Sequence, residues 1–155
     1  MRIFGNNKTE TPYILKTASD RISETAIQFK TINVSNKNAD YFYTFELLQA
    51  KEINQIKLGF EQENFDWKLD LEASNNQTEW FLIQKDYRIL SIKNSQTDYK
   101  FTQVDFPDSK YKFYRIKIKA SEQPKLTEAK IWEQQKEEGS FKTATIKTLK
   151  KTIDV

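Results

Sequence analysis

The sequence contains no cysteine and no histidine among its 155 residues. The chain therefore has no disulfide, no thiol nucleophile, no thiolate or imidazole zinc site and no Ser-His-Asp triad. Its three glycines, Gly5, Gly59 and Gly139, are isolated, so no glycine-rich phosphate-binding loop is present. No pair stands out among the 22 acidic residues as the acid and base of a hydrolase. We therefore expect a protein that is not an enzyme.

The sequence also lacks regions of a single charge sign and long apolar runs. The 25 basic and 22 acidic residues are interspersed, whereas a nucleic-acid-binding surface needs basic residues without neighbouring acids. No run of about 18 apolar residues could span a membrane, and the N-terminal MRIFGNNKTE lacks the apolar region of a signal peptide. We expect no nucleic-acid partner and no direct membrane insertion. These features alone indicate a cytosolic protein or a piece of a longer chain.

Alternation of apolar and polar residues is the main pattern that is present. Aromatic residues, which favour strands, make up 14% of the chain. Every second residue is apolar, with the exception of Thr102, in five stretches: 41–47, 56–60, 67–73, 102–106 and 114–118. The segments between them are rich in Asn, Asp and Ser, which suit turns. An apolar face and a solvent-exposed face in each strand predict an all-β protein that folds as an antiparallel β-sandwich.

Three local features refine this prediction. The stretch TASDRISETAIQF, residues 17–29, comes nearest to a helical pattern and could form a single turn. Pro107 is expected to end the strand that precedes it. In LTEAKIW the alternation slips by one residue near Thr127 and Glu128. A β-bulge there would keep the apolar residues on both sides of the slip facing the core.

The order of these segments resembles the galactose-binding-like jelly-roll superfamily, which includes discoidin or coagulation-factor type C domains and many bacterial carbohydrate-binding modules. The segments are YFYTFELL, INQIKL, WKLDLEASNNQTEWFLI, VDFP, YKFYRIKI and LTEAKIW, within residues 40–133. Seven residues match the superfamily pattern: Ser74, Trp80, Tyr114, Arg115, Ile116, Leu126 and Glu128. The resemblance implies a jelly roll that binds its ligand among the loops at one pole.

The N-terminal RIFGNNKTETPYIL is similar to a segment of an uncharacterised family of bacterial envelope proteins. That family has tandem jelly-roll domains outside the cytoplasm and a membrane anchor near the C-terminus. The resemblance implies an extracytoplasmic location, in the periplasm or cell envelope, within a longer membrane-anchored chain. We expect residues 1–16 to be edge strands that could end a preceding domain. Residues 17–135 would be the jelly roll, and residues 136–155 a linker with an accessory strand or the start of a next domain.

The loops SNKNADY and EQENFDW combine amides, acids and aromatic rings, as a glycan site requires, although ordinary turn chemistry would explain them too. The candidate ligand-binding residues are Asn36, Asn38, Asp40, Tyr41, Phe65, Asp66 and Tyr99. Trp67 and Trp80 could stack on a sugar, but we expect both in the core, whereas Trp132 could lie outside.

Glu128 matches the position of a glutamate that holds a structural calcium ion in many members of the superfamily. The usual partner loop is replaced by NKNADYFYTF, so we expect no cofactor. The predicted function is a non-catalytic recognition or structural module that binds a glycan or a protein through its loops. The alternative is a purely structural spacer without a small-molecule ligand.

Overall fold

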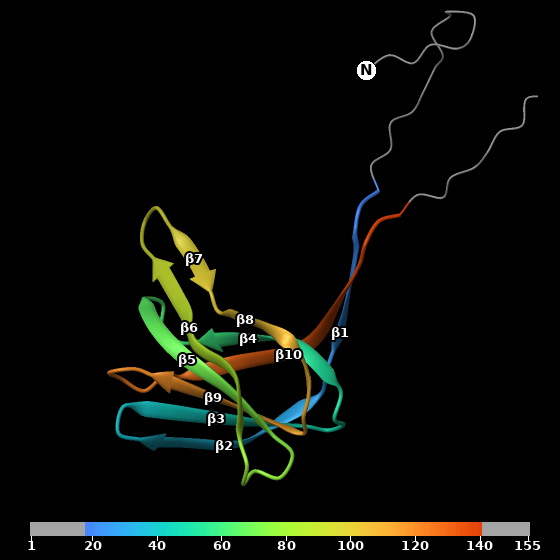
Figure 1. Ribbon diagram of the computed structural model, residues 1–155. Helices are drawn as coiled ribbons and strands as arrows, with labels where there is room; N and C mark the ends of the chain where they lie inside the picture. The colour runs from blue at the N-terminus through green and yellow to red at the C-terminus, as the bar shows by residue number, and fades with distance from the viewer. Residues whose placement is uncertain (1–17, 141–155) are drawn as a thin grey trace, which may run out of the picture. The chain divides into compact units, whose positions relative to one another are not determined.

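The computed structural model describes residues 18–140, which contain ten β-strands and no helix (Figure 1). The strands are β1 Arg21–Ala26, β2 Phe29–Lys37, β3 Asp40–Leu47, β4 Glu52–Phe60, β5 Phe65–Ser74, β6 Phe81–Lys93, β7 Asp98–Phe101, β8 Gln103–Lys110, β9 Phe113–Lys119 and β10 Leu126–Glu137. The predicted helical turn within residues 17–29 is therefore wrong, because strands β1 and β2 occupy that stretch.

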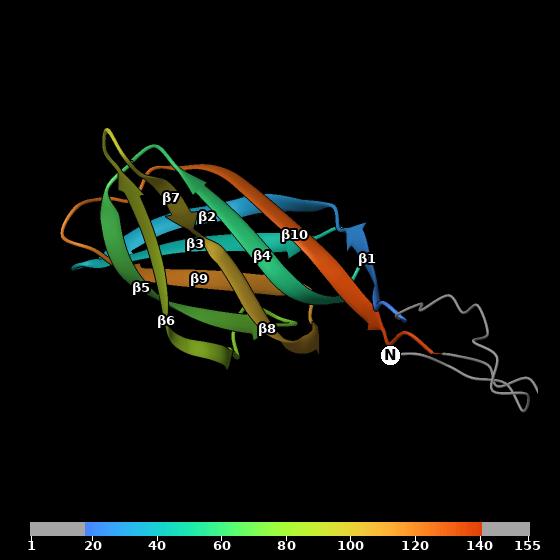
Figure 2. The same ribbon diagram turned by 90° about the horizontal axis from the view of Figure 1, so that it is seen from above.

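The strands form two sheets that lie face to face (Figures 1 and 2). One sheet has the order β1-β10-β4-β8, and the other has the order β2-β3-β9-β5-β6-β7. All strand pairs between β2 and β10 with a described register are antiparallel. Strand β9 lies between β3 and β5, so neighbours in the sheet come from distant parts of the chain. This architecture confirms the predicted antiparallel β-sandwich.

The core is built from the alternating residues that the sequence places on one face of each strand. Because side chains of a strand alternate between its two faces, each strand contributes every second residue to the space between the sheets. The buried residues that were predicted in this way are Tyr43, Phe45, Leu47, Ile56, Leu58, Trp67, Leu69, Leu71, Ala73, Thr102, Val104, Phe106, Tyr114, Ile116 and Ile118. The alternation therefore identified most of the core, although Tyr41 and Phe60 are only partly buried.

Strand β10 contains the predicted bulge. Its register against β4 shifts between Leu126 and Glu128, so two residues of β10 oppose one residue of β4 there. Leu126 and Ala129 consequently both pack against the core, and Ile131 is buried.

The prediction for Pro107 is wrong, because β8 continues through it to Lys110. Strand β8 is the outer strand of its sheet. A proline is tolerated on an outer strand because its missing N–H need not pair with a neighbour.

Residues Ser23–Gln135 form one compact unit, and residues 18–22 and 136–140 belong to another. Within the described part of the second unit, Asp20 pairs with Lys136 at 2.8 Å and accepts a hydrogen bond from the backbone N–H of Gly139. These two contacts lower the pKa of Asp20. The predicted divisions at residues 16 and 135 stay predictions, and most of the terminal segments 1–16 and 136–155 lies outside the described residues.

Candidate functional site

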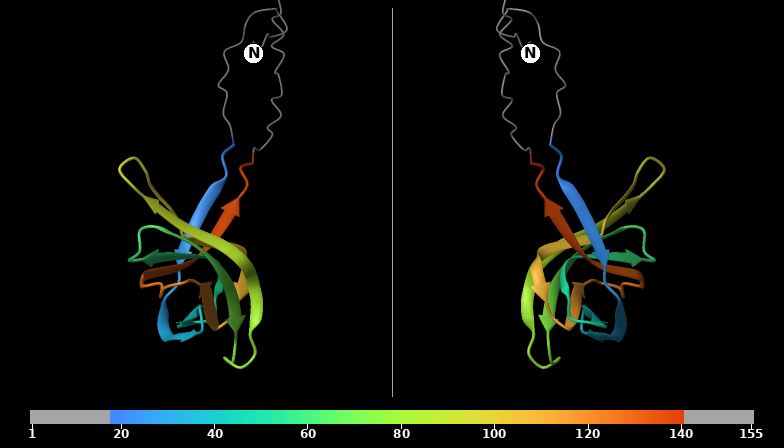
Figure 3. Two further views of the ribbon diagram at one scale, coloured as in Figure 1. Left: turned by 90° about the vertical axis from the view of Figure 1, so that its left-hand side faces the viewer. Right: turned by 90° about the vertical axis from the view of Figure 1, so that its right-hand side faces the viewer.

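Four connections lie at one end of the sandwich, which we call the loop pole. They are the β2–β3 turn, the β4–β5 loop, the β6–β7 turn and the β9–β10 loop (Figure 3, left). The backbone N–H of Ala120 donates to Ala39 O at 3.2 Å, and that of Glu61 donates to Lys125 O at 2.9 Å. The β9–β10 loop is therefore bonded to the β2–β3 turn on one side and to the β4–β5 loop on the other.

Side chains hold the β9–β10 loop in place as well. The amide of Gln62 accepts a hydrogen bond from Lys125 N at 3.0 Å and donates one to Gln123 O at 2.8 Å. The ammonium group of Lys125 lies 3.2 Å from the carboxylate of Glu61. These contacts give the loop a defined conformation, as a binding surface requires.

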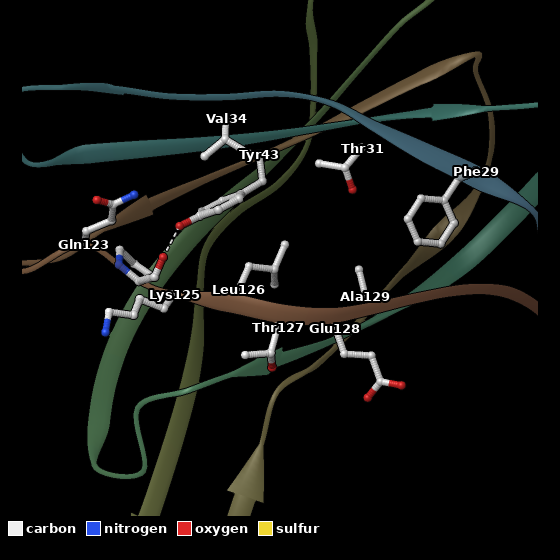
Figure 4. A pocket seen from close by; sticks show the side chains of 11 residues that line it. Phe29, Thr31, Val34, Tyr43, Gln123, Lys125, Leu126, Thr127, Glu128 and Ala129 are labelled. Carbon is white, nitrogen blue, oxygen red and sulfur yellow. Dashed lines mark hydrogen bonds between the residues drawn. The ribbon is translucent and has the colours of Figure 1, made fainter.

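A groove of about 540 Å³ runs along the open side of the sandwich from this loop (Figure 4). We call it the edge groove. It separates the outermost strand of the six-stranded sheet, β2, from the first half of β10 in the other sheet. Its lining consists of Phe29, Thr31, Val34, Tyr43, Gln123, Pro124, Lys125, Leu126, Thr127, Glu128 and Ala129.

Tyr43 joins the two walls of the edge groove. Its ring is buried in the core, and its hydroxyl donates a hydrogen bond to the carbonyl of Pro124 (Figure 4). Burial raises the pKa of the Tyr43 hydroxyl, so the group stays a neutral donor at neutral pH. The tyrosine thereby ties the β9–β10 loop to strand β3.

The remaining lining of the edge groove is mixed in polarity. Hydroxyls of Thr31 and Thr127 and the amide of Gln123 can both donate and accept hydrogen bonds. Glu128 adds a carboxylate whose pKa is lowered by its ion pair with Lys130, at 2.9 Å. The apolar part of the lining comes from the aromatic and aliphatic side chains of β2 and β10. This combination suits a ligand that has hydroxyl groups and an apolar face.

The structure places the predicted hairpin residues at the loop pole. Asn36 and Asn38 lie at the end of β2 and in the turn, and Asp40 and Tyr41 begin β3. Asn38 has a φ of 58°, a left-handed conformation that asparagine tolerates better than most residues. The carboxylate of Asp40 lies 3.7 Å from the ammonium group of Lys117, on the outer face of the sheet.

The other predicted ligand-binding residues have different environments. Phe65 stacks on Trp67 with ring centroids 4.0 Å apart, so one face of its ring is used in packing. Asp66 forms a two-point ion pair with Arg88, at 2.8 and 2.7 Å. Tyr99 lies on β7 and is 51% exposed. Asp66 and Tyr99 are therefore accessible, whereas Phe65 is a packing residue.

The three tryptophans also differ. Trp67 is buried, as predicted. Trp80 is only half-buried, contrary to prediction, because its ring lies on the outer face of the six-stranded sheet with the guanidinium of Arg115 4.0 Å from its centroid. Trp132 is half-buried, and its indole N–H has no partner among the described residues.

Sequence reasoning did not identify the edge groove. Its residues come from the edge strand β2 and from the β9–β10 loop with the start of β10, which are far apart in the sequence. One local signal was available, the slip in alternation at Thr127 and Glu128, because bulges often redirect side chains beside binding sites.

No group of three acidic side chains within residues 18–140 is close enough to hold a metal ion. The suggestion that Glu128 binds calcium stays a prediction from resemblance. The same residues contain no helix with the length and hydropathy needed to cross a bilayer.

Acidification should lower the melting temperature through the ion pairs of the loop pole. Hydrogen bonds from Lys93 and Arg88 lower the pKa of Glu63 and Asp66, respectively. Because the pKa of each carboxyl is lower in the folded state, its stabilisation is complete above the ordinary pKa and is lost as the pH falls below about 4. On acidification, the melting temperature of Asp66→Asn should decrease less than that of Glu79→Gln, an exposed control. Equal decreases in the two variants would contradict a stabilising role of the ion pair between Asp66 and Arg88.

Comparison with known proteins supports the fold. No family model and no curated protein matches the chain. Among solved structures, a truncated AlyQ with CBM32 and alginate lyase domains is similar, with a TM-score of 0.53 and 13% identity over 81% of this chain and 36% of that chain. CpGH89CBM32-6 from Clostridium perfringens has a TM-score of 0.46 and 19% identity over 76% of this chain and 95% of its own. The C-terminal domain of a chitobiase from Bacteroides fragilis has a TM-score of 0.46 and 12% identity over the same shares.

The first of these likenesses carries the assignment of fold. Together with the strand order, it confirms the predicted antiparallel β-sandwich. At this level of identity the likeness concerns the fold alone, and fold does not determine function.

Proposed function

We propose that this chain is a non-catalytic module that binds a glycan in the edge groove at the loop pole. The observation that carries the proposal is the mixed lining of the groove, where hydroxyl, amide and carboxylate groups lie beside apolar side chains (Figure 4). A sugar ring has apolar C–H faces and hydroxyl groups around its rim, so it is complementary to such a lining. The solved neighbour with a CBM32 domain makes a carbohydrate ligand the first class to test.

The edge groove is built in a way that favours binding over catalysis. Tyr43, Gln62 and Lys125 hold its walls through hydrogen bonds that exist without a ligand, so little ordering is required when a ligand binds. Its only carboxylate, Glu128, is paired with Lys130 and lacks a second acid in the lining that could act with it.

We extend the proposal to the loop residues predicted from sequence. Asn36, Asn38, Asp40 and Tyr41 lie on the hairpin that the β9–β10 loop contacts, so they could meet a ligand that extends beyond the groove. Asp66 and Tyr99 are accessible at the same end or close to it. We further propose that the module belongs to a bacterial extracytoplasmic protein. The full-length gene tests this point, since it should encode a signal peptide and neighbouring jelly-roll domains.

The groove is tested by binding neutral glycans and cell-wall fragments to the wild-type protein and to the double variant Gln123→Ala/Thr127→Val. Loss of two neutral hydrogen bonds should weaken binding by about tenfold. The double variant Gln49→Ala/Thr78→Val, with the same changes at exposed sites outside the loop pole, should bind like the wild type. Isothermal titration and ligand-induced shifts in melting temperature measure the effect.

The alternative function is a structural spacer without a small-molecule ligand. It predicts that no glycan raises the melting temperature and that the two double variants behave alike. That result would exclude the edge groove as a glycan site, and the sandwich would then serve only to separate its neighbours.

A further inference from the structure

A row of charged side chains crosses the outer face of the six-stranded sheet next to the loop pole. Directly opposite pairs are Lys37 and Asp40, Asp40 and Lys119, Lys119 and Lys68, and Lys68 and Arg88. The row therefore passes through β2, β3, β9, β5 and β6, which lie side by side in the sheet (Figure 1). We call these five residues the cross-strand row; directly opposite residues share a face of the sheet.

Elsewhere on this face, positive charges are matched by carboxylates. Arg115 pairs with Glu72 at 2.6 Å. Lys117 lies between two carboxylates, 3.4 Å from Asp70 and 3.7 Å from Asp40. Arg115 and Lys117, which lie further from the loop pole, are therefore both paired with carboxylates of the same sheet.

The cross-strand row is different because two lysines lie next to each other at its centre, although Asp40 faces Lys119 and the charge of Lys68 acts on the carboxylate of Asp66. Lys68 and Lys119 are exposed, and neither forms an ion pair with any residue in the range 18–140. They face each other across β5 and β9, and Lys68 also faces Arg88. Like charges in directly opposite positions destabilise a sheet. The Lys68–Lys119 pair therefore does not stabilise the free protein, and an anion placed over it would relieve the repulsion.

We propose that the cross-strand row binds the carboxylates of an acidic polysaccharide, a polyuronate that lies across the strands. Neighbouring strands are about 4.8 Å apart, so Lys119, Lys68 and Arg88 on the successive strands β9, β5 and β6 present positive charges at a regular spacing to a polymer that has an acidic group on each sugar. Arg88 is at the β6 end of the row, and its guanidinium is already paired with the carboxylate of Asp66. This inference rests on the proposed function only in taking the ligand to be a glycan, because the row shares no residue with the edge groove.

The test compares binding of polygalacturonate oligosaccharides with binding of the same oligosaccharides after reduction of their carboxyl groups. The double variant Lys68→Gln/Lys119→Gln should bind the acidic form about tenfold more weakly than the wild type, since each exposed contact contributes little. The double variant Lys51→Gln/Lys110→Gln removes the same charge from exposed sites outside the row and should bind like the wild type. Added salt should weaken wild-type binding because exposed charges are screened.

The same variants provide a readout without ligand. Removing the repulsion between Lys68 and Lys119 should raise the melting temperature by about 1 to 3 °C at low salt. The inference is overturned if the double variant melts at a lower temperature, if it binds polygalacturonate as the wild type does, or if the reduced oligosaccharides bind as tightly as the acidic ones. Absence of polygalacturonate binding overturns it too. Binding of neutral glycans is measured separately for the wild type and for Gln123→Ala/Thr127→Val. A weaker binding by the variant shows that the edge groove is a glycan site whether or not the cross-strand row binds polygalacturonate.

Discussion

Replacing Phe45 with alanine should lower the free energy of unfolding by about 3 to 5 kcal/mol. Phe45 is completely buried in the central region of the six-stranded sheet, opposite Tyr114 of β9. Its ring meets the ring of Phe29 edge to face, with centroids 5.4 Å apart. Alanine would leave a cavity between the sheets that these neighbours cannot fill without moving. Chemical denaturation followed by tryptophan fluorescence measures the loss.

Phe45→Ala also connects stability with the proposed function. Phe29 packs on Phe45 and lines the edge groove, so loss of its support should weaken glycan binding as well. Phe81→Ala is the matched control, because Phe81 is 52% exposed and its replacement should cost less than about 1 kcal/mol. Equal losses of stability in the two variants would contradict the description of the core.

Replacing Arg115 with alanine should lower the free energy of unfolding by about 1 to 2 kcal/mol. Its guanidinium pairs with the carboxylate of Glu72 at 2.6 Å and lies over two rings, with centroids at 4.0 Å for Trp80 and 5.5 Å for Phe42. Arg115→Lys should recover only part of the loss, because an ammonium group keeps the charge but cannot stack as a planar group.

A double-mutant cycle of Arg115→Ala with Trp80→Leu separates stacking from the ion pair. We expect a coupling of about 0.5 to 1 kcal/mol, since the contact is partly exposed. Additive effects of the two substitutions would show that the guanidinium gains nothing from the ring. The change in the emission of Trp80 on loss of Arg115 provides an independent measurement.

The predictions that succeeded depend on local patterns. Alternation along Tyr41–Leu47 and Trp67–Ala73 identified the inner face, because a strand places every second side chain on the same side. The slip at Thr127 and Glu128 located the bulge for the same reason. Asn38 in the turn confirmed that a small polar residue can take the place of glycine in a left-handed conformation.

The predictions that failed involve a choice between environments that look alike in sequence. Pro107 was expected to end a strand, yet it lies within β8. Strand β8 is at the edge of its sheet, where a proline is tolerated. Alternation places Phe113 on the face opposite Tyr114 and Ile116, which points to solvent, but Phe113 is buried. Trp80 has the apolar surface of a core residue, and Arg115 covers it on the outer face.

The sequence by itself determined the fold class, the inner face of most strands, the bulge in β10 and the exclusion of thiol, imidazole and glycine-loop chemistry, because each depends on composition or on neighbouring residues. Only the tertiary structure decided which strands lie side by side. The edge groove between β2 and β10 and the cross-strand row from Lys37 to Arg88 both depend on that order. Strand order results from contacts between distant segments, and periodicity along one strand contains no information about its neighbour. Both proposed sites therefore became visible only when the two sheets were assembled.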